Sequence, residues 1–164
     1  MTESTLCAEF LAESEPVLVL PKQRLPAIRL ATATYGPFRP LFRTEVPLWL
    51  ALALKAKDKC SIVPPTWLEA GKPVLQQSKS SLEQHLALEK SQPQFSDLPF
   101  HYLEIGMMLL DSAADDMNGA EDIRRLLSDL RQLRETKIRA GLEAVDGMYL
   151  QASDAMFFRI YYFR

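Results

Sequence analysis

The sequence predicts a mainly helical α+β protein in which a small β-rich domain comes first and a helical domain follows. Prolines divide the first 43 residues into short apolar runs, a pattern typical of short strands. An almost wholly apolar segment then precedes the double proline Pro64-Pro65, and apolar residues beyond it recur with helical spacing. We therefore expect residues 1–62 to form the β-rich domain with its connecting helix (about 45–60), and residues 63–164 to form the helical domain.

The N-terminal segment is expected to hold one or two helical turns and a small sheet. Glu9–Glu13 suits the helical turns, whereas Val17–Leu20 and Ala27–Leu30 are short apolar runs that suit strands. The prolines that bound these runs are Pro16, Pro21 and Pro26. Because proline cannot donate to a strand ladder, it is confined to edges, and this predicts a small sheet.

The connecting helix is predicted from its apolar run and from the residues at its two ends. Pro47 suits the first helical turn, where its missing N–H is not needed. Leu48–Leu54 is apolar on every side, so the helix should be covered all round. Lysines follow at Lys55, Lys57 and Lys59, where the helix dipole favours positive charge. Pro64-Pro65 should then end the helix and mark the domain boundary.

Three further helices are expected in the second domain. Thr66 and Glu69 have the spacing of a capping box that opens a short turn, with a longer helix over about 74–90. A third helix is expected over 99–114, with a core face listed as Tyr102, Leu103, Ile105, Met107, Met108, Leu109 and Leu110. The strongest pattern begins at Asn118 and runs to about residue 145. Its apolar side comprises Ile123, Leu126, Leu127, Leu130, Leu133, Ile138, Leu142 and Val145.

Composition excludes several classes of function. The chain has 164 residues, 48% hydrophobic and 24% charged, and a formal net charge of −2, which argues against a dedicated DNA-binding domain. Cys7 and Cys60 lie far apart, and with only His85 and His101 they do not give the spacing of a zinc site. No apolar run approaches the ~20 residues of a membrane span, so we expect no membrane partner.

No set of residues has the arrangement of an active site. Five acidic residues cluster between two predicted helices: Asp111, Asp115, Asp116, Glu121 and Asp122. They suit either a divalent metal or general acid site, or solvated charge that favours the start of the next helix. Stabilisation of the start of the next helix already explains the positions of these acidic residues. Neither His85 nor His101 has a nearby Ser or Cys within a nucleophile motif. No phosphate-binding glycine loop occurs, so we expect no enzyme and no cofactor.

Several short motifs occur in a recognisable order along the chain. They are Glu9-Phe10-Leu11-Ala12-Glu13, Gly36-Pro37-Phe38, Glu45-Val46-Pro47-Leu48-Trp49-Leu50-Ala51, Lys59-Cys60, Pro64-Pro65 with Trp67, Asp122-Ile123-Arg124, and the spaced Arg134, Lys137 and Arg139. In this order over about residues 8–145, they resemble the GINS complex subunits of the second Psf type, from eukaryotic DNA replication. The resemblance ends over the last dozen or so residues, where Ala155–Arg164 is rich in aromatic side chains.

The resemblance implies a fold and a function. The second domain would be a helical domain of the GINS A type, and the chain a non-catalytic structural subunit of a heterotetramer. The implied partners are the three other GINS subunits and, through the assembled complex, the MCM helicase ring and its Cdc-type partner. The implied compartment is the nucleus, without direct sequence-specific DNA binding. The alternative is a helical adaptor subunit of another obligate multiprotein complex.

Seven residues are candidates for an interface with partner chains: Phe38, Trp49, Trp67, Arg124, Arg134, Lys137 and Arg139. Large aromatic residues and arginines often anchor interfaces. Arg134 and Lys137 fall within the apolar sector of the last predicted helix. Their stems could cover the core with the charged groups in water, or the charges could meet carboxylates of a partner. The residue pattern leaves both open, and the resemblance favours the interface.

Overall fold

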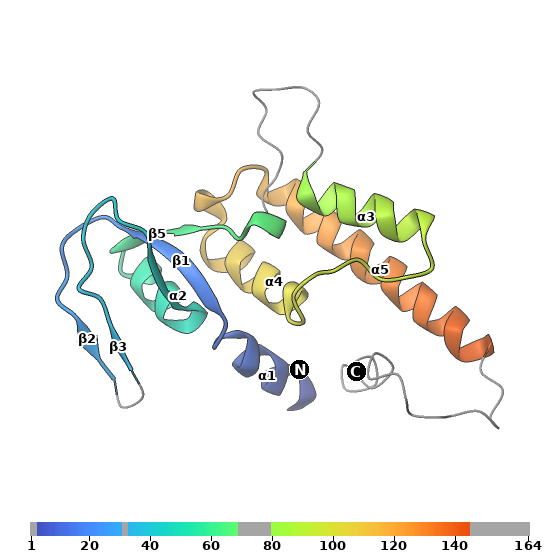
Figure 1. Cartoon of the computed structure of the whole chain (residues 1–164), viewed down its shortest axis with the longest axis horizontal. Helices are drawn as coiled ribbons and strands as arrows, with labels where there is room; N and C mark the ends of the chain where they lie inside the picture. The colour runs from blue at the N-terminus through green and yellow to red at the C-terminus, as the bar shows by residue number, and fades with distance from the viewer. Residues whose placement is uncertain (1–2, 31–32, 69–79, 145–164) are drawn as a thin grey trace.

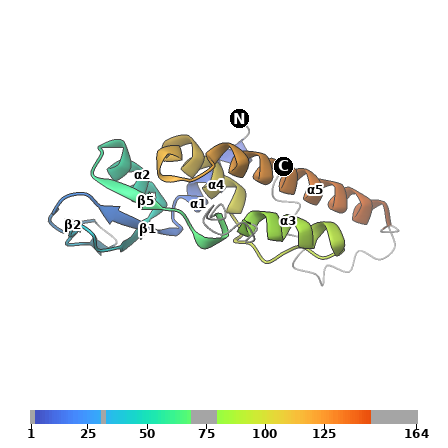
Figure 2. The same cartoon turned by 90° about the horizontal axis from the view of Figure 1, so that it is seen from above.

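A computed structural model describes residues 3–30, 33–68 and 80–144 of the chain (Figure 1). The small sheet lies at one end of an elongated molecule, and two long helices lie side by side at the other (Figures 1 and 2). This arrangement confirms the predicted fold class, a small β-rich part followed by a helical part. Among the described residues, no helix is long and apolar enough to cross a membrane.

The elements follow one another in mixed order along the N-terminal part and are almost purely helical afterwards. They are α1 (Glu3–Ala12), β1 (Pro16–Pro21), β2 (Ile28–Arg29), β3 (Thr34–Tyr35), β4 (Thr44–Pro47), α2 (Leu48–Ala56), β5 (Cys60–Val63), the 3-10 turn η1 (Thr66–Leu68), α3 (Ser81–Ser91), α4 (Tyr102–Ser112), the 3-10 turn η2 (Ala114–Asp116) and α5 (Ala120–Ala144). Two predicted strands are confirmed as β1 and β2. The predicted turns at Glu9–Glu13 are the end of the longer helix α1.

The main sheet has three antiparallel strands in the order β4-β1-β5, with β1 in the centre. Burial alternates along β1, so that Val17 and Val19 are buried whereas Leu18 between them is exposed. The buried face also contains Val46 of β4 and Ile62 of β5. Helix α2 connects β4 to β5 and contacts all three strands, so it covers this face.

The connecting helix is shorter than predicted, and its ends lie elsewhere. Residues 44–47 form β4, and Pro47 is the residue before the helix rather than a member of its first turn. The N–H groups of Leu48 and Trp49 donate to backbone carbonyls near the end of α1, which satisfies two donors of the first turn. The prediction that Pro64-Pro65 ends the helix was wrong, because α2 ends at Ala56 and the strand β5 intervenes.

The sheet and the helices share one continuous apolar core. Helix α2 contacts α4 as well as the sheet, and α1 also contacts α4. At Gly106 of α4, an added Cβ would lie 2.7 Å from Leu127 Cδ1, so glycine allows α4 to pack closely on α5. The division of the chain into domains at residues 62 and 63 stays a prediction.

The three predicted helices of the second part are confirmed with shifted ends. Helix α3 begins after Ser80, which forms a capping box with Glu83 that was not predicted. The predicted box at Thr66 involves Glu69, which lies outside the described residues, as does the aromatic segment 155–164. The core face predicted for α4 is buried or half-buried except at Met107, which is 37% exposed.

Candidate interaction surfaces

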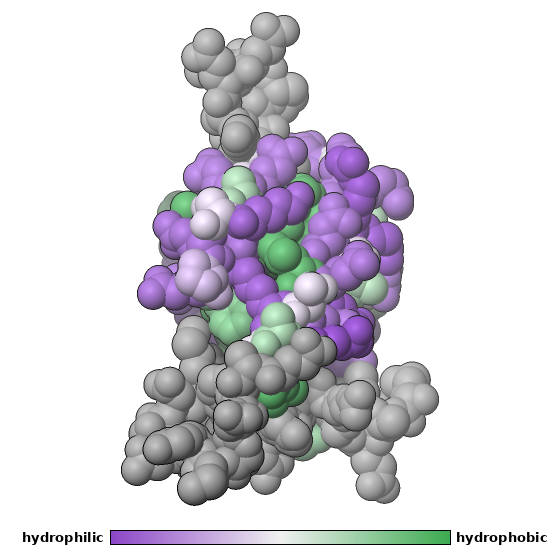
Figure 3. Space-filling view, turned by 90° about the vertical axis from the view of Figure 1, so that its right-hand side faces the viewer, coloured by the Kyte–Doolittle hydropathy of each residue, from purple (hydrophilic) through white to green (hydrophobic). Residues whose placement is uncertain are grey.

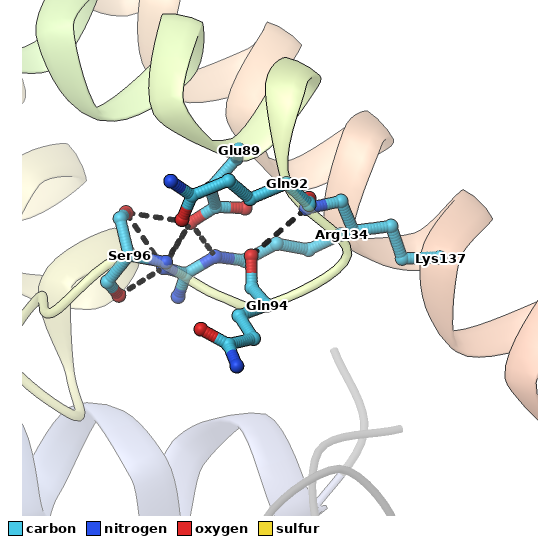
Figure 4. A network of polar contacts seen from close by, with 6 residues as sticks. All are labelled: Glu89, Gln92, Gln94, Ser96, Arg134 and Lys137. Carbon is cyan, nitrogen blue, oxygen red and sulfur yellow. Dashed lines mark hydrogen bonds and ion pairs between the residues drawn. The ribbon is translucent and has the colours of Figure 1, made fainter.

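Arg134 of α5 is held by a buried carboxylate of the same chain (Figure 4). Its Nε donates to Glu89 Oε1 at 2.9 Å, and its Nη2 donates to the Ser96 carbonyl at 3.0 Å. The Ser96 hydroxyl donates to the same Glu89 oxygen at 2.6 Å. The Glu89 side chain is fully buried, and the Arg134 side chain is 18% exposed. Because a buried charge needs a partner, this pair joins α5 to α3 and to the loop that follows α3.

Aromatic rings and backbone carbonyls complete the same site. The Arg134 guanidinium carbon lies 4.7 Å from the centre of the Tyr102 ring and 5.4 Å from that of Phe95, a cation–π geometry. One turn later on α5, Lys137 Nζ donates to the carbonyls of Gln92 and Gln94 at 2.7 and 3.0 Å. The two cations of α5 therefore hold the loop between α3 and α4 against α5 (Figure 4).

The charged groups of Arg134 and Lys137 are not simply in water, because both donate to acceptors of this chain. Their role at an interface with a partner stays a prediction. Burial raises the pKa of the Glu89 carboxyl, but hydrogen bonds from Arg134 and Ser96 outweigh it and hold that pKa below its ordinary value. Glu89 is thus a stable anion around which this part of the bundle is organised.

A second charged cluster joins the sheet to the helices. Lys55 at the end of α2 contacts Asp115 Oδ2 at 2.7 Å and Asp116 Oδ2 at 2.8 Å. Asp116 Oδ2 also accepts from the backbone N–H of Ile62 in β5 at 2.7 Å. Burial lowers the pKa of Lys55, but the bonds to the two aspartates raise it overall. Two members of the predicted acidic cluster therefore connect η2 to α2 and β5.

Two other members of the acidic cluster, Asp111 and Asp122, make surface ion pairs. Asp111 lies 3.3 Å from Arg124, and Asp122 lies 3.3 Å from Arg125, within its own helix. Within residues 3–30, 33–68 and 80–144, no group of three His, Cys, Asp or Glu side chains could hold a metal ion. His101 is buried and contacts the Phe100 ring edge-on, with 4.6 Å between ring centres.

The remaining candidate interface residues differ in exposure. Phe38 is fully buried, so its side chain supports the fold beneath the surface. Trp49 is 38% exposed, and Trp67 is half-buried against the core. Arg124 is partly exposed beside Asp111, whereas Arg139 is 77% exposed and lies 3.9 Å from Glu135. The role of these residues at an interface stays a prediction.

Several exposed apolar residues were not singled out from the sequence. Leu41 is the most exposed, at 84%, and its neighbour Phe42 is 66% exposed, in the loop that leads into β4. Phe10 of α1 is 70% exposed. At the end of the molecule where α5 finishes, apolar residues form a band between hydrophilic ones (Figure 3). The exposed large apolar residues of α3 and α5 are Leu88 and Leu142.

Comparison with known protein families matches both parts of the chain. A model described as the PSF2 N-terminal domain matches residues 5–63, and one described as the GINS complex protein helical bundle domain matches residues 76–159. The chain belongs to the GINS protein family, PSF2 type. The match to the helical bundle continues into the last dozen residues, where the resemblance was expected to end, and includes half of the aromatic segment 155–164.

Similar proteins occur in fungi and vertebrates. The chain is 41% identical over 142 residues to the DNA replication complex GINS protein psf2 of Schizosaccharomyces pombe, covering 87% of this chain and 73% of the relative. It is 38% identical to PSF2 of Xenopus laevis and 36% identical to PSF2 of Homo sapiens, each over 137 residues. Both alignments cover 83% of this chain and 69% of the relative.

Proposed function

We propose that this chain is the PSF2-type structural subunit of a four-chain GINS complex and that it acts in DNA replication in the nucleus. The observation that supports this most directly is the tandem match of the two family models in the expected order. The relatives that match are themselves described as DNA replication complex GINS proteins. The subunit would work without a cofactor and without catalysis of its own.

The proposed mechanism is mechanical. The helical part packs side by side with the helical parts of the three other GINS subunits, and the sheet part braces the complex against the MCM ring and its Cdc-type partner. Two features support a scaffold role. The Glu89–Arg134 pair and the Lys55–Asp116 pair stiffen the helical bundle and its junction with the sheet. Exposed apolar residues such as Phe10, Leu88 and Leu142 supply surface that a permanent partner would cover.

Co-expression with the three other GINS subunits, followed by size-exclusion chromatography with light scattering, tests this function. We expect a particle with one copy of each chain. Leu142→Glu should weaken assembly, because it places a charge in the apolar surface of α5. Gln132→Glu is the matched control, since it adds the same charge to the same helix at another exposed position.

The outcomes separate the proposal from its alternative. A chain that stays outside the particle but binds another protein tightly would be a helical adaptor of a different complex. A chain that folds cooperatively as a stable monomer and has no affinity for the other subunits would overturn the scaffold proposal. ATP hydrolysis by the four-chain particle without the ring would contradict the non-catalytic role.

A further inference from the structure

The charge of this chain is very unevenly distributed. Residues 22–43, here called the basic arm, contain five basic residues and no acidic one. Since the whole chain has a formal charge of −2, the arm is +5 and the remainder is −7. The arm includes the β2–β3 ribbon, and it lies at the end of the molecule opposite α3 and α5 (Figure 1).

Most of the positive charge of the basic arm has no partner in the described parts of the chain. Lys22 pairs with Asp58. The four arginines are exposed and make no ion pair with any carboxylate in the described residues: Arg24, Arg29, Arg39 and Arg43. The antiparallel bridge between Leu25 and Phe38 also places Arg24 and Arg39 side by side. Like charges in such positions repel, and a bound anion would relieve the repulsion.

Two apolar side chains project between these arginines. Leu41 and Phe42 stand between Arg39 and Arg43 in the sequence and are the most exposed large apolar pair in the described residues. The backbone holds them in a turn, because the Phe42 N–H donates to the Arg39 carbonyl at 3.3 Å. Leu41 has a φ of 68°, the left-handed region that a bulky residue rarely adopts.

The base of the basic arm is anchored, so the exposed residues are presented from a fixed position. Phe38 is fully buried, and its N–H and carbonyl both bond to Leu25 across the bridge, at 3.0 and 3.1 Å. Surfaces that are ordered before binding lose less conformational freedom on association. Arginine and aromatic residues fixed in this way are typical of a binding surface.

We propose that the basic arm is a docking surface for an acidic protein segment in which apolar side chains stand between carboxylates. Arginine pairs with carboxylates in a planar, two-pronged geometry, which suits arginines that form no ion pair with a described carboxylate. The exposed side chains of Leu41 and Phe42 favour a protein over a nucleic acid as the partner. Phosphates would satisfy the arginines equally well, but a nucleic acid backbone offers little to an exposed leucine. The proposal goes beyond assembly of the GINS complex and does not depend on it.

Fluorescence anisotropy of the full chain with three labelled probes of equal length tests the docking surface. The probes are a peptide of repeated Glu-Asp-Leu-Glu units, a polyglutamate peptide and a single-stranded oligonucleotide. We expect the first probe to bind most tightly and its affinity to fall as salt is added. Polyglutamate should bind roughly ten-fold more weakly, because burial of a few apolar side chains supplies about 1.4 kcal/mol or more.

Two double variants separate the contributions of charge and apolar surface. Arg39→Gln with Arg43→Gln should lower the affinity for both peptides at least roughly ten-fold, as expected when charge-assisted hydrogen bonds are lost. Leu41→Ser with Phe42→Ser should weaken only the peptide that contains leucine. Arg125→Gln with Arg139→Gln is the control, because these arginines are exposed on α5, outside the arm.

The results that would overturn the proposal are distinct. If the oligonucleotide binds more tightly than either peptide and the arginine variant abolishes this, the arm is a nucleic-acid surface. If the control variant weakens the peptides as much as the arm variant does, the binding is unspecific attraction to positive charge. If neither peptide binds at low salt, the arm has no affinity for this class of partner. Each result leaves the assembly test of the GINS complex unaffected.

Discussion

Arginine has opposite roles at the two ends of this molecule. In the helical part, Arg134 is largely buried, bonded to the carboxylate of Glu89 and stacked against aromatic rings. In the basic arm, Arg24 and Arg39 lie side by side and exposed, and neither forms an ion pair with a described carboxylate. Burial forces a charge to find a partner within its own chain, whereas an exposed charge remains available to another molecule. The first kind holds the fold together, and the second is suited to recognition.

The largest loss of stability is expected when the buried guanidinium of Arg134 is removed. Arg134→Met keeps most of the apolar stem but leaves Glu89 as an uncompensated buried carboxylate. The free energy of unfolding should fall by about 3–5 kcal/mol, as for other buried pairs with one partner removed. Urea unfolding monitored by circular dichroism, on the chain alone or in its complex, measures this loss.

A nearby arginine provides the control for that substitution. Arg131 also lies on α5 and bonds to Glu135 at 2.9 Å, but its side chain is 62% exposed. Arg131→Met should cost at most about 0.5 kcal/mol, the value of an exposed pair one turn apart. Equal losses of stability for the two variants would show that burial does not distinguish the two arginines. That result would contradict the contrast between buried and exposed arginines.

A substitution at the junction between the sheet and the helices should cause an intermediate loss of stability. Asp116 is 12% exposed, bonds to Lys55 and accepts from the Ile62 N–H. Asp116→Ala should destabilise the protein by about 1–3 kcal/mol, because it leaves the backbone N–H of Ile62 without its acceptor and the largely buried Lys55 ammonium with only the exposed Asp115. Asp115→Ala should have a much smaller effect, since that side chain is 73% exposed. Thermal unfolding of the two variants, measured side by side, tests this order.

Acid should weaken the Glu89–Arg134 pair selectively. The pKa of Glu89 is held below its ordinary value of 4.5 in the folded protein. The stabilisation is therefore complete above about pH 4.5 and is lost as the pH falls from there through the lower folded pKa. In Arg134→Met, this part of the acid dependence should be much reduced. Urea unfolding at a series of pH values below 6 would reveal it, and parallel curves for the two proteins would contradict it.

The long helices were the most predictable part of the fold. Helix α5 has 25 residues, and its repeated apolar spacing predicts the helix and its buried side as far as Leu130, whereas Leu142 on the same predicted side is exposed. The strand β5 has only four residues, and its pairing partner is β1, about forty residues earlier in the chain. Such a strand is stabilised by partners distant in sequence, so local patterns gave no sign of it.

The contacts of the charged side chains were equally hard to predict, because their partners are also distant in sequence. Periodicity placed Arg134 in the apolar sector of its helix, but it could not indicate that Glu89, 45 residues earlier, would supply the carboxylate. The basic arm is different, because its signal was in the sequence: no acidic residue occurs between Glu15 and Glu45. The net charge of −2 for the whole chain does not reveal that uneven distribution, because the positive and negative regions nearly cancel. A running charge along the chain would have found it.

The smallest effect on stability is expected in the basic arm. Arg24→Gln with Arg39→Gln removes two exposed charges that repel each other and bond to no described carboxylate. The free energy of unfolding should change by less than about 0.5 kcal/mol, and any change should be a gain at low salt. Urea unfolding at low and high salt measures it. A loss above about 1 kcal/mol would mean that these arginines support the fold as Arg134 does, which would remove the contrast between the two ends and weaken the case for the arm as a recognition surface.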